Sequence, residues 1–266
     1  FLADRLPFYQ FLSARIAMSN QSFENKVQDS NKSSGSHDSP SKRVTKKRVI
    51  TRPHAFWYHC CQGALYVLLK LMFRIKYINS KNVPVAGPTL LVSNHQSFLD
   101  PPAIGCGYFR MTNFLARKTL FKFKPFGKLI DSVDAIPLET QGLGFQGIKE
   151  TLRRLKNDEA VLIFPEGSRC YDGELAPFTS GYASLAVKSN AVIVPVAIAG
   201  AFEAFPRTKK FPSPFKPRVK VEYGTPVRPE EYAGKTDEEI CRLVETQIRE
   251  IYERIRRRPS EKRKRL

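Results

Sequence analysis

The sequence predicts an α/β domain with a mixed, largely parallel sheet flanked by helices. Three observations lead to this fold class. From residue 82 onward, short apolar runs alternate with segments of helical periodicity, which is the order expected of an α/β domain. Hydrophobic residues make up 42% of 266 residues, enough for one sizeable core. Two of the apolar runs end abruptly in polar residues, where sheets of this class carry their active sites.

The elements follow in order along the chain. Strands are expected at residues 89–92, 113–116, 135–138, 160–164, 191–198 and 219–223, and helices at 145–155, 178–187 and 236–258. Pro195 lies inside the fifth of these strands, which predicts an edge position or a bulge there because proline cannot donate to a ladder.

The first fifty residues do not resemble a folded unit. Residues 1–17 lack the uninterrupted apolar core of a signal peptide, and an authentic start at Met18 would be unsurprising. Residues 19–47 contain almost no large apolar side chains, so they cannot offset the entropy of ordering. We therefore assign 1–50 to a disordered basic and polar segment, 81–258 to the α/β domain and 259–266 to a basic tail.

Residues 51–80 are predicted to contain an amphipathic helix. One face carries the polar residues His59, Gln62, Gly63, Tyr66, Lys70 and Arg74, and the other carries Trp57, Cys61, Ala64, Leu65, Leu68, Leu69 and Met72. This pattern favours a helix lying in the plane of a membrane surface over one that spans the bilayer. A helix packed against the protein core is the alternative.

The net charge indicates the kind of partner, and the cysteines indicate the redox compartment. A net charge of +19 implies an anionic partner, and nucleic acid, acidic phospholipid and phosphorylated small molecules all qualify. The five cysteines are odd in number and match no zinc-binding spacing, which predicts free thiols in a reducing compartment and no metal site.

His95 and Asp100 give the chain its strongest functional signal. They are separated by four residues directly after the apolar run 88–92, so the two side chains can meet across a tight turn. The carboxylate would then fix the imidazole tautomer and support the charge that the ring gains on taking a proton. We predict that His95 is a general base and that Asp100 is its partner.

A second strand end, at Glu166-Gly167-Ser168-Arg169, has the features of an anion receptor. Backbone N–H groups at a glycine turn beside a guanidinium suit a phosphate, which arginine can hold bidentately. An arginine paired with a nearby carboxylate is the alternative. Lys118, which follows another strand, either adds to the same positive pocket or belongs to a solvated surface.

These residues carry a family resemblance. Asn94-His95 with Asp100, followed by residues 164–169, resembles the glycerolipid acyltransferases, and the 1-acyl-sn-glycerol-3-phosphate acyltransferases most closely. Residues 117–127 and 193–200 resemble two further blocks of that family, in the expected order. Thr140 stands where the family usually has an arginine, so either the acceptor is atypical or Arg169 and Lys118 carry its charge alone.

The resemblance implies fatty acyl transfer from acyl-CoA or acyl carrier protein to a lysophospholipid, with 1-acyl-sn-glycerol 3-phosphate as the favoured acceptor. It implies catalysis by His95 and Asp100 and substrate binding by Asn94, Lys118, Glu166, Gly167, Ser168 and Arg169. No cofactor, metal or nucleic acid is expected. The resemblance also implies a peripheral or monotopic position on the cytoplasmic face of a membrane.

Two other readings remain open at this point. The same base and phosphate pocket would serve another lysophospholipid acyltransferase, a CoA-independent transacylase or a phospholipase. A serine hydrolase is disfavoured because no Gly-x-Ser-x-Gly motif occurs. The charge alone would also fit a non-enzymatic basic protein that binds membrane or nucleic acid.

Overall fold

A computed structural model describes residues 52–122, 124–133, 135–138, 144–209, 211–215 and 218–256. The predicted disordered segment 1–50, Thr140 and the basic tail 259–266 lie outside these residues.

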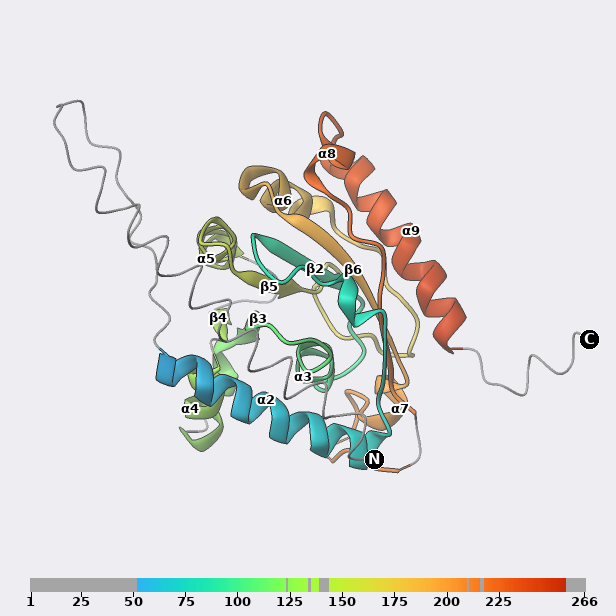
Figure 1. The fold of residues 1–266 in the computed structure, drawn as a ribbon. Helices are drawn as coiled ribbons and strands as arrows, with labels where there is room; N and C mark the ends of the chain where they lie inside the picture. Colours follow the sequence, from blue (N-terminus) through green and yellow to red (C-terminus); the bar gives the residue numbers. More distant parts are fainter. Residues whose placement is uncertain are drawn as a thin grey trace, which may run out of the picture. The chain divides into compact units, whose positions relative to one another are not determined.

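A seven-stranded sheet forms the centre of the fold, in the order β1-β7-β6-β2-β5-β3-β4 (Figure 1). The strands are β1 (Lys76–Ile78), β2 (Thr89–Ser93), β3 (Thr112–Arg117), β4 (Ile136–Leu138), β5 (Ala160–Ile163), β6 (Val192–Ala199) and β7 (Lys220–Tyr223). Neighbours pair in parallel except β6 and β7, which are antiparallel. The predicted fold class, a mixed and largely parallel sheet, is confirmed.

Helices cover both faces of this sheet (Figure 1). The described helices are α2 (Arg52–Phe73), α3 (Asp100–Gly105), α4 (Lys124–Ser132), α5 (Gly144–Lys156), α6 (Ala183–Ser189), α7 (Ala201–Ala204), α8 (Pro229–Tyr232) and α9 (Asp237–Arg256), with 3-10 turns η2 (Ser80–Asn82), η3 (Lys118–Lys122) and η4 (Ser180–Tyr182). Residues of α5, α6, α8 and α9 pack on one face, and residues of α2, α3 and α7 on the other.

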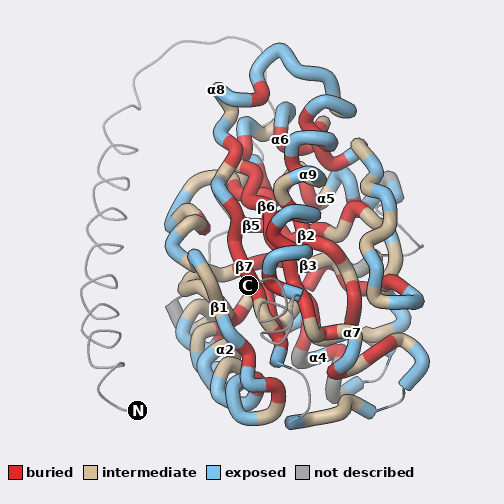
Figure 2. Tube along the Cα trace, turned by 90° about the vertical axis from the view of Figure 1, so that its right-hand side faces the viewer, coloured by how far each residue is buried: buried red, intermediate tan, exposed pale blue. Residues whose placement is uncertain are grey.

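Each central strand contributes to two cores, because successive strand side chains point to opposite faces. In β2, Leu90 and Val92 belong to the cluster with α5, α6 and α9, whereas Leu91 belongs to the cluster with α2, α3 and α7. All three are fully buried, and Figure 2 shows the buried trace running through the central strands. This double burial explains why the strands are continuous apolar runs in the sequence.

The long helix α9 has a clear sequence origin. Thr236 and Glu239 form a reciprocal cap, because the Glu239 amide donates to Thr236 Oγ1 at 3.2 Å and the Thr236 amide donates to the Glu239 carboxylate at 2.7 Å. Apolar residues at three- and four-residue steps then face the sheet, namely Ile240, Val244, Ile248, Ile251 and Ile255. The predicted helix 236–258 is therefore confirmed nearly to its ends.

Several shorter elements escaped the sequence analysis. Strand β1 and helices α3, α7 and α8 span six residues or fewer, too short for hydrophobic periodicity to mark them, and the nine-residue α4 was also missed. The edge position predicted for Pro195 is wrong, because β6 lies between β7 and β2. Pro195 has no N–H to donate, and it lies in a gap of the antiparallel pairing on the β7 side of β6. The β6–β7 ladder starts at Val196, and the isolated bridge of Ile193 with Val227 lies on the other side of the gap. This interrupted pairing corresponds to the bulge alternative.

Helix α2 packs on the core, which was the alternative to the predicted membrane-surface helix. Leu69 and Phe73 are only 2% and 3% exposed, and Gln62 Nε2 donates to the carbonyl oxygens of Gly105 and Tyr108 at 2.7 and 2.9 Å. Both the polar residue and Leu69 therefore face the protein, since the contact surface of α2 spans parts of both predicted faces. The large apolar side chains that it exposes are Phe56, Trp57, Val67, Leu68 and Leu71. Among the described helices, none is long and apolar enough to cross a membrane.

Candidate active site

Two loops at the carboxyl edge of the sheet build the site. Strands β2 and β5 are parallel neighbours, with Val92 opposite Ile163. The loop that follows β2 carries His95, and the loop that follows β5 carries Glu166, so both loops leave the sheet side by side. The Cys170 amide donates to the carbonyl oxygen of His95 at 2.9 Å and joins them. The two strand ends that were predicted to share one site therefore lie side by side.

His95 and Asp100 form the predicted pair. His95 Nδ1 lies 2.8 Å from Asp100 Oδ2, and because an ionised carboxylate only accepts, Nδ1 carries the proton and Nε2 is the basic nitrogen. The imidazole stacks on Phe164 with ring centroids 4.0 Å apart and planes 16° apart. The His95 side chain retains 19% exposure, so the ring is oriented on two sides and still reachable.

Asp100 is held rigidly by the loop that it closes. Its Oδ2 also accepts from the amides of Gln96 and Ser97, at 2.6 and 2.7 Å, and the residue is fully buried. Asp100 is the first residue of α3 and is followed by two prolines, which fit the first helical turn because its N–H groups need no helical partner. The spacing between His95 and Asp100 thus follows from a turn that leads into a helix.

Glu166 stabilises the loop between β2 and α3, residues 94–99, which carries His95 and is called the histidine loop below. Its Oε1 accepts from the His95 amide at 2.8 Å, and its Oε2 accepts from the Ala176 amide at 3.2 Å. Burial raises the pKa of the Glu166 carboxyl to about 7, while these two backbone N–H groups act in the opposite direction. The contacts differ from the substrate-binding role predicted for Glu166 and make it a positioning residue for His95.

Asn94 also has a different place from the one predicted. It is 1% exposed, its Nδ2 donates to the Ile198 carbonyl at 3.0 Å, and its Oδ1 accepts from the Ile198 amide at 2.9 Å. Both polar atoms of the side chain therefore continue the pairing of β2 with β6 beyond the end of the strand. Asn94 therefore supports the loop, and its predicted role in substrate binding stays a prediction.

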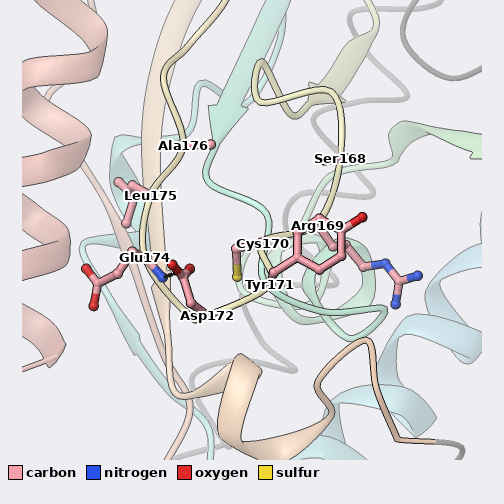
Figure 3. Close-up of a pocket in the computed structure, with 8 residues that line it drawn as sticks. All are labelled: Ser168, Arg169, Cys170, Tyr171, Asp172, Glu174, Leu175 and Ala176. Carbon is pink, nitrogen blue, oxygen red and sulfur yellow. Dashed lines mark hydrogen bonds between the residues drawn. The ribbon is translucent and has the colours of Figure 1, made fainter.

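Arg169 lies at the rim of a hollow of about 360 Å³. Its guanidinium stacks on the ring of Phe98, with Cζ 3.5 Å from the centroid. Figure 3 shows Arg169 and Tyr171 on one side of this hollow and Glu174 on the other. Since Glu174 is paired with Arg256 at 2.7 Å, an anion is expected on the side of Arg169.

Gly167 and Ser168 form the turn that leads to Arg169. Gly167 has φ +71°, a conformation for which glycine is suited, and its amide donates to the Phe164 carbonyl at 3.1 Å. That amide is used by the turn itself, and phosphate binding by the other amides around Gly167 stays a prediction. Ser168 is half-buried and lines the hollow.

Lys118 lies farther along the same edge of the sheet. It opens η3 directly after β3, which is separated from β2 by β5, and it is exposed. Its participation in substrate binding stays a prediction.

Two residues near the site were missed by the sequence analysis. Arg207 Cζ lies 4.4 Å from the centroid of the Tyr171 ring, and the Phe205 ring lies 5.9 Å from that of Phe98. Both belong to the segment after β6, more than one hundred residues from the histidine motif, so local spacing could not connect them. The clustering of arginine and lysine with phenylalanine in that segment was the available signal.

A pH titration should show the buried state of Glu166. Because its pKa is about 7 in the folded protein against an ordinary 4.5, the folded state holds more protons between these values. The contribution of this carboxyl to the free energy of unfolding is therefore full below pH 4.5 and is lost as pH rises through 7. Chemical unfolding from pH 5 to 8 should show the stability of wild type falling relative to Glu166→Gln. A difference that does not change with pH would contradict the assignment.

The described residues also bear on the predicted chemistry of cysteine and metal. All five cysteines are free thiols. Within the described ranges, no group of three or more His, Cys, Asp or Glu side chains is arranged to hold a metal ion.

Comparisons with known proteins identify the family. The acyltransferase family model matches residues 74–199. A 1-acyl-sn-glycerol-3-phosphate acyltransferase of Bacillus subtilis is 31% identical over 144 residues, which cover 54% of this chain and 71% of the relative. A chloroplastic enzyme of the same name from Brassica napus is 30% identical over 132 residues, which cover 47% of this chain and 37% of the relative. The chain thus spans less than half the length of the plant protein.

A solved structure shares the fold. The crystal structure of the 1-acyl-sn-glycerophosphate acyltransferase PlsC from Thermotoga maritima superposes with a TM-score of 0.64 at 24% identity, over 77% of this chain and 80% of PlsC. Fold, site and family model together define an O-acyltransferase. More particularly, the chain belongs to the 1-acyl-sn-glycerol-3-phosphate acyltransferase family. The resemblance carried by the two motifs is confirmed.

Proposed function

We propose that this protein transfers a fatty acyl group from a thioester to the free hydroxyl of 1-acyl-sn-glycerol 3-phosphate and so produces phosphatidate for phospholipid biosynthesis. The observation that carries the proposal is the accessible imidazole of His95, held by Asp100 at 2.8 Å on a loop that abuts the one bearing Arg169. A positioned base beside a cation is what a phosphorylated alcohol needs in order to react.

His95 moves the proton. Its Nε2 takes the proton of the acceptor hydroxyl as the oxygen attacks the thioester carbonyl carbon. The tetrahedral intermediate then collapses with cleavage of the C–S bond, and the imidazolium returns its proton to the departing thiolate. Asp100 stabilises the positive ring between these two steps, and no acyl-enzyme is formed.

Arg169 binds the acceptor phosphate. Stacking on Phe98 engages the face of the guanidinium, whereas hydrogen bonds to a phosphate are made by its edge. Ser168 lies beside it, and Lys118 supplies further positive charge along the same edge of the sheet. Acyl-CoA or acyl carrier protein is the donor, and the mechanism assigns every proton transfer to His95 without a cofactor or metal.

An acceptor screen tests the function. Purified protein in lipid vesicles would receive labelled acyl-CoA or acyl carrier protein with glycerol 3-phosphate, lysophosphatidate, lysophosphatidylglycerol or a phosphate-free lysolipid. We expect labelled product only when donor and acceptor are both present, and most with lysophosphatidate. Product formed without the thioester would indicate a transacylase or phospholipase, and no product with any pair would favour a binding protein.

The exposed side of α2 is the proposed membrane contact. Val67, Leu68 and Leu71 are 52%, 49% and 66% exposed, although they lie on a helix whose opposite side is packed in the core. Apolar side chains of this size on one helix face suit the boundary between headgroups and acyl chains. The protein would thereby bind peripherally or monotopically, on the cytoplasmic face where acyl donors are available.

Substitution of this face should release the protein from lipid without unfolding it. The double variant Val67→Ser/Leu71→Ser should lower partition to vesicles by roughly ten-fold or more, since each side chain loses part of its transfer free energy. Sedimentation with vesicles measures the partition. Leu69→Ser is the contrasting control: it should lower the melting temperature, because Leu69 is buried in the core. Unchanged partition of the double variant would refute the contact.

A further inference from the structure

The segment between Glu203 and Glu222 has an unusual composition. It contains six lysines and arginines, three phenylalanines and four prolines, and no carboxylate. We call its described residues 205–209, 211–215 and 218–219 the aromatic–basic loop. A solvated basic loop would not need large apolar side chains, so their presence requires an explanation.

The loop exposes two of its phenylalanines. Phe211 is 80% exposed and Phe215 is 66% exposed. Phe215 also has φ +69°, which is uncommon for a bulky residue and costs free energy unless the surroundings maintain it. The fold therefore holds an aromatic ring outward at a cost rather than burying it.

Backbone hydrogen bonds fix the loop against the end of α2. The Phe215 amide donates to the Met72 carbonyl at 2.7 Å, and the Val219 amide donates to the Phe73 carbonyl at 3.2 Å. At its other end, the Ser213 amide donates to the Ala204 carbonyl at 2.7 Å. Figure 1 shows this segment, after α7, beside the end of α2. Phe215 is thus held at the C-terminal end of α2, one residue beyond the exposed Leu71.

The beginning of the loop contacts the active site. Ser97 Oγ, within the histidine loop, donates to the Phe205 carbonyl at 2.7 Å. Phe205 is near Phe98, on which Arg169 stacks, and Arg207 stacks on Tyr171. The described parts of the loop therefore lie at the rim of the site and at the C-terminal end of α2.

We propose that the aromatic–basic loop is a second lipid-binding element, with Phe211 and Phe215 inserted among acyl chains and Lys209 and Arg218 on anionic headgroups. Together with α2 it gives two contacts, which fix the tilt of the protein so that the Arg169 rim of the site faces the lipid surface. We expect the loop to bind a lipid bilayer. Its exposed aromatic rings suit the boundary with the acyl chains. Its cations, in a segment without carboxylates, suit anionic headgroups. The orientation rests on the proposed acyltransferase function, whereas the binding does not.

Vesicle sedimentation tests the apolar part. Phe211→Ser should lower partition to vesicles of phosphatidylcholine and phosphatidylglycerol by roughly ten-fold, as expected when a phenylalanine side chain loses its apolar environment. Val187→Ser is the matched control, because Val187 is 49% exposed on α6, which packs on the other face of the sheet. Both variants should keep the melting temperature of wild type. Equal partition of Phe211→Ser and Val187→Ser would overturn the proposal.

The charged part should depend on headgroup and salt. Lys209→Gln and Arg218→Gln should each weaken binding to anionic vesicles by roughly five-fold at low salt, and should have no effect on pure phosphatidylcholine or at high salt. Arg242→Gln, on exposed α9, is the control and should match wild type. A loss that persists on neutral vesicles would argue for a structural role instead.

Activity separates this proposal from the proposed function. With acceptor and donor dispersed as monomers, Phe211→Ser should turn over at the wild-type rate, and with acceptor embedded in vesicles its rate should fall with its partition. If wild type acylates no acceptor, the proposed function fails while the partition result still stands. If Phe211→Ser is equally slow with monomers, the loop acts on the site directly and the lipid assignment is wrong.

Discussion

Replacing His95 by alanine should lower acyl transfer by about 10²-fold or more, the range typical for loss of a positioned general base. The imidazole is the group that can accept the hydroxyl proton here, and alanine leaves no substitute on the histidine loop. The measurement is the initial rate of labelled phosphatidate formation with lysophosphatidate and an acyl thioester. Near-normal turnover of the variant would refute the mechanism.

A second histidine provides a matched control. His59 stacks on Phe109 with ring centroids 3.9 Å apart and planes 18° apart, nearly the geometry of His95 on Phe164. Its ring is paired with Gln62 instead of a carboxylate, and burial lowers its pKa. His59→Ala removes equivalent packing, so any loss of activity beyond that of His59→Ala reports on chemistry at His95.

Asp100→Asn separates orientation from charge. The asparagine oxygen can still accept from the amides of Gln96 and Ser97, so the turn into α3 should persist. The same oxygen can also accept from His95 Nδ1 and keep its tautomer, because one oxygen of Asp100 makes all three contacts, but it carries no negative charge to support the imidazolium. We expect a severe loss of activity with vesicle binding intact, measured on the same preparation. A melting temperature well below that of wild type would instead show that the turn into α3 has been lost.

The sequence could predict the parts of this protein that depend on local pattern. The buried strands β2 and β5 are visible as apolar runs because both of their faces are covered. His95 and Asp100 are visible because one turn joins them. The two motifs meet because their strands are adjacent, which the rule on strand ends anticipates.

Contacts between residues far apart in the sequence could not be predicted from local sequence patterns. Asn94 and Glu166 are polar residues in the right motifs, yet their partners are the backbone of Ile198 and His95, which only the folded sheet brings near. For α2, periodicity could divide the helix into faces but could not say which one the core would cover. Gln62 faces the protein because two carbonyl groups, at the end of α3 and just beyond it, accept from its amide, and no feature of the helix sequence predicts that.

The second large effect concerns the acceptor phosphate. Arg169→Ala should raise the acceptor KM by roughly 10- to 100-fold, which corresponds to losing a hydrogen-bonded ion pair. The loss falls mainly on KM because the phosphate is bound equally in the ground state and the transition state. Steady-state rates with lysophosphatidate as the varied substrate provide the measurement, and a smaller fall in kcat is expected if the acceptor hydroxyl is also misplaced.

A lysine at the same position distinguishes charge from geometry. Arg169→Lys keeps the positive charge but has neither the planar fork for a phosphate nor the flat face that stacks on Phe98, so it should recover only part of the lost affinity. A phosphate-free lysolipid is the internal control, and its weak turnover should be the same in wild type and both variants. Arg242→Ala, an exposed arginine on α9, should leave both acceptors unaffected. If wild type uses the phosphate-free lysolipid as well as lysophosphatidate, Arg169 does not bind a phosphate, because a guanidinium that holds the phosphate should favour the phosphorylated acceptor.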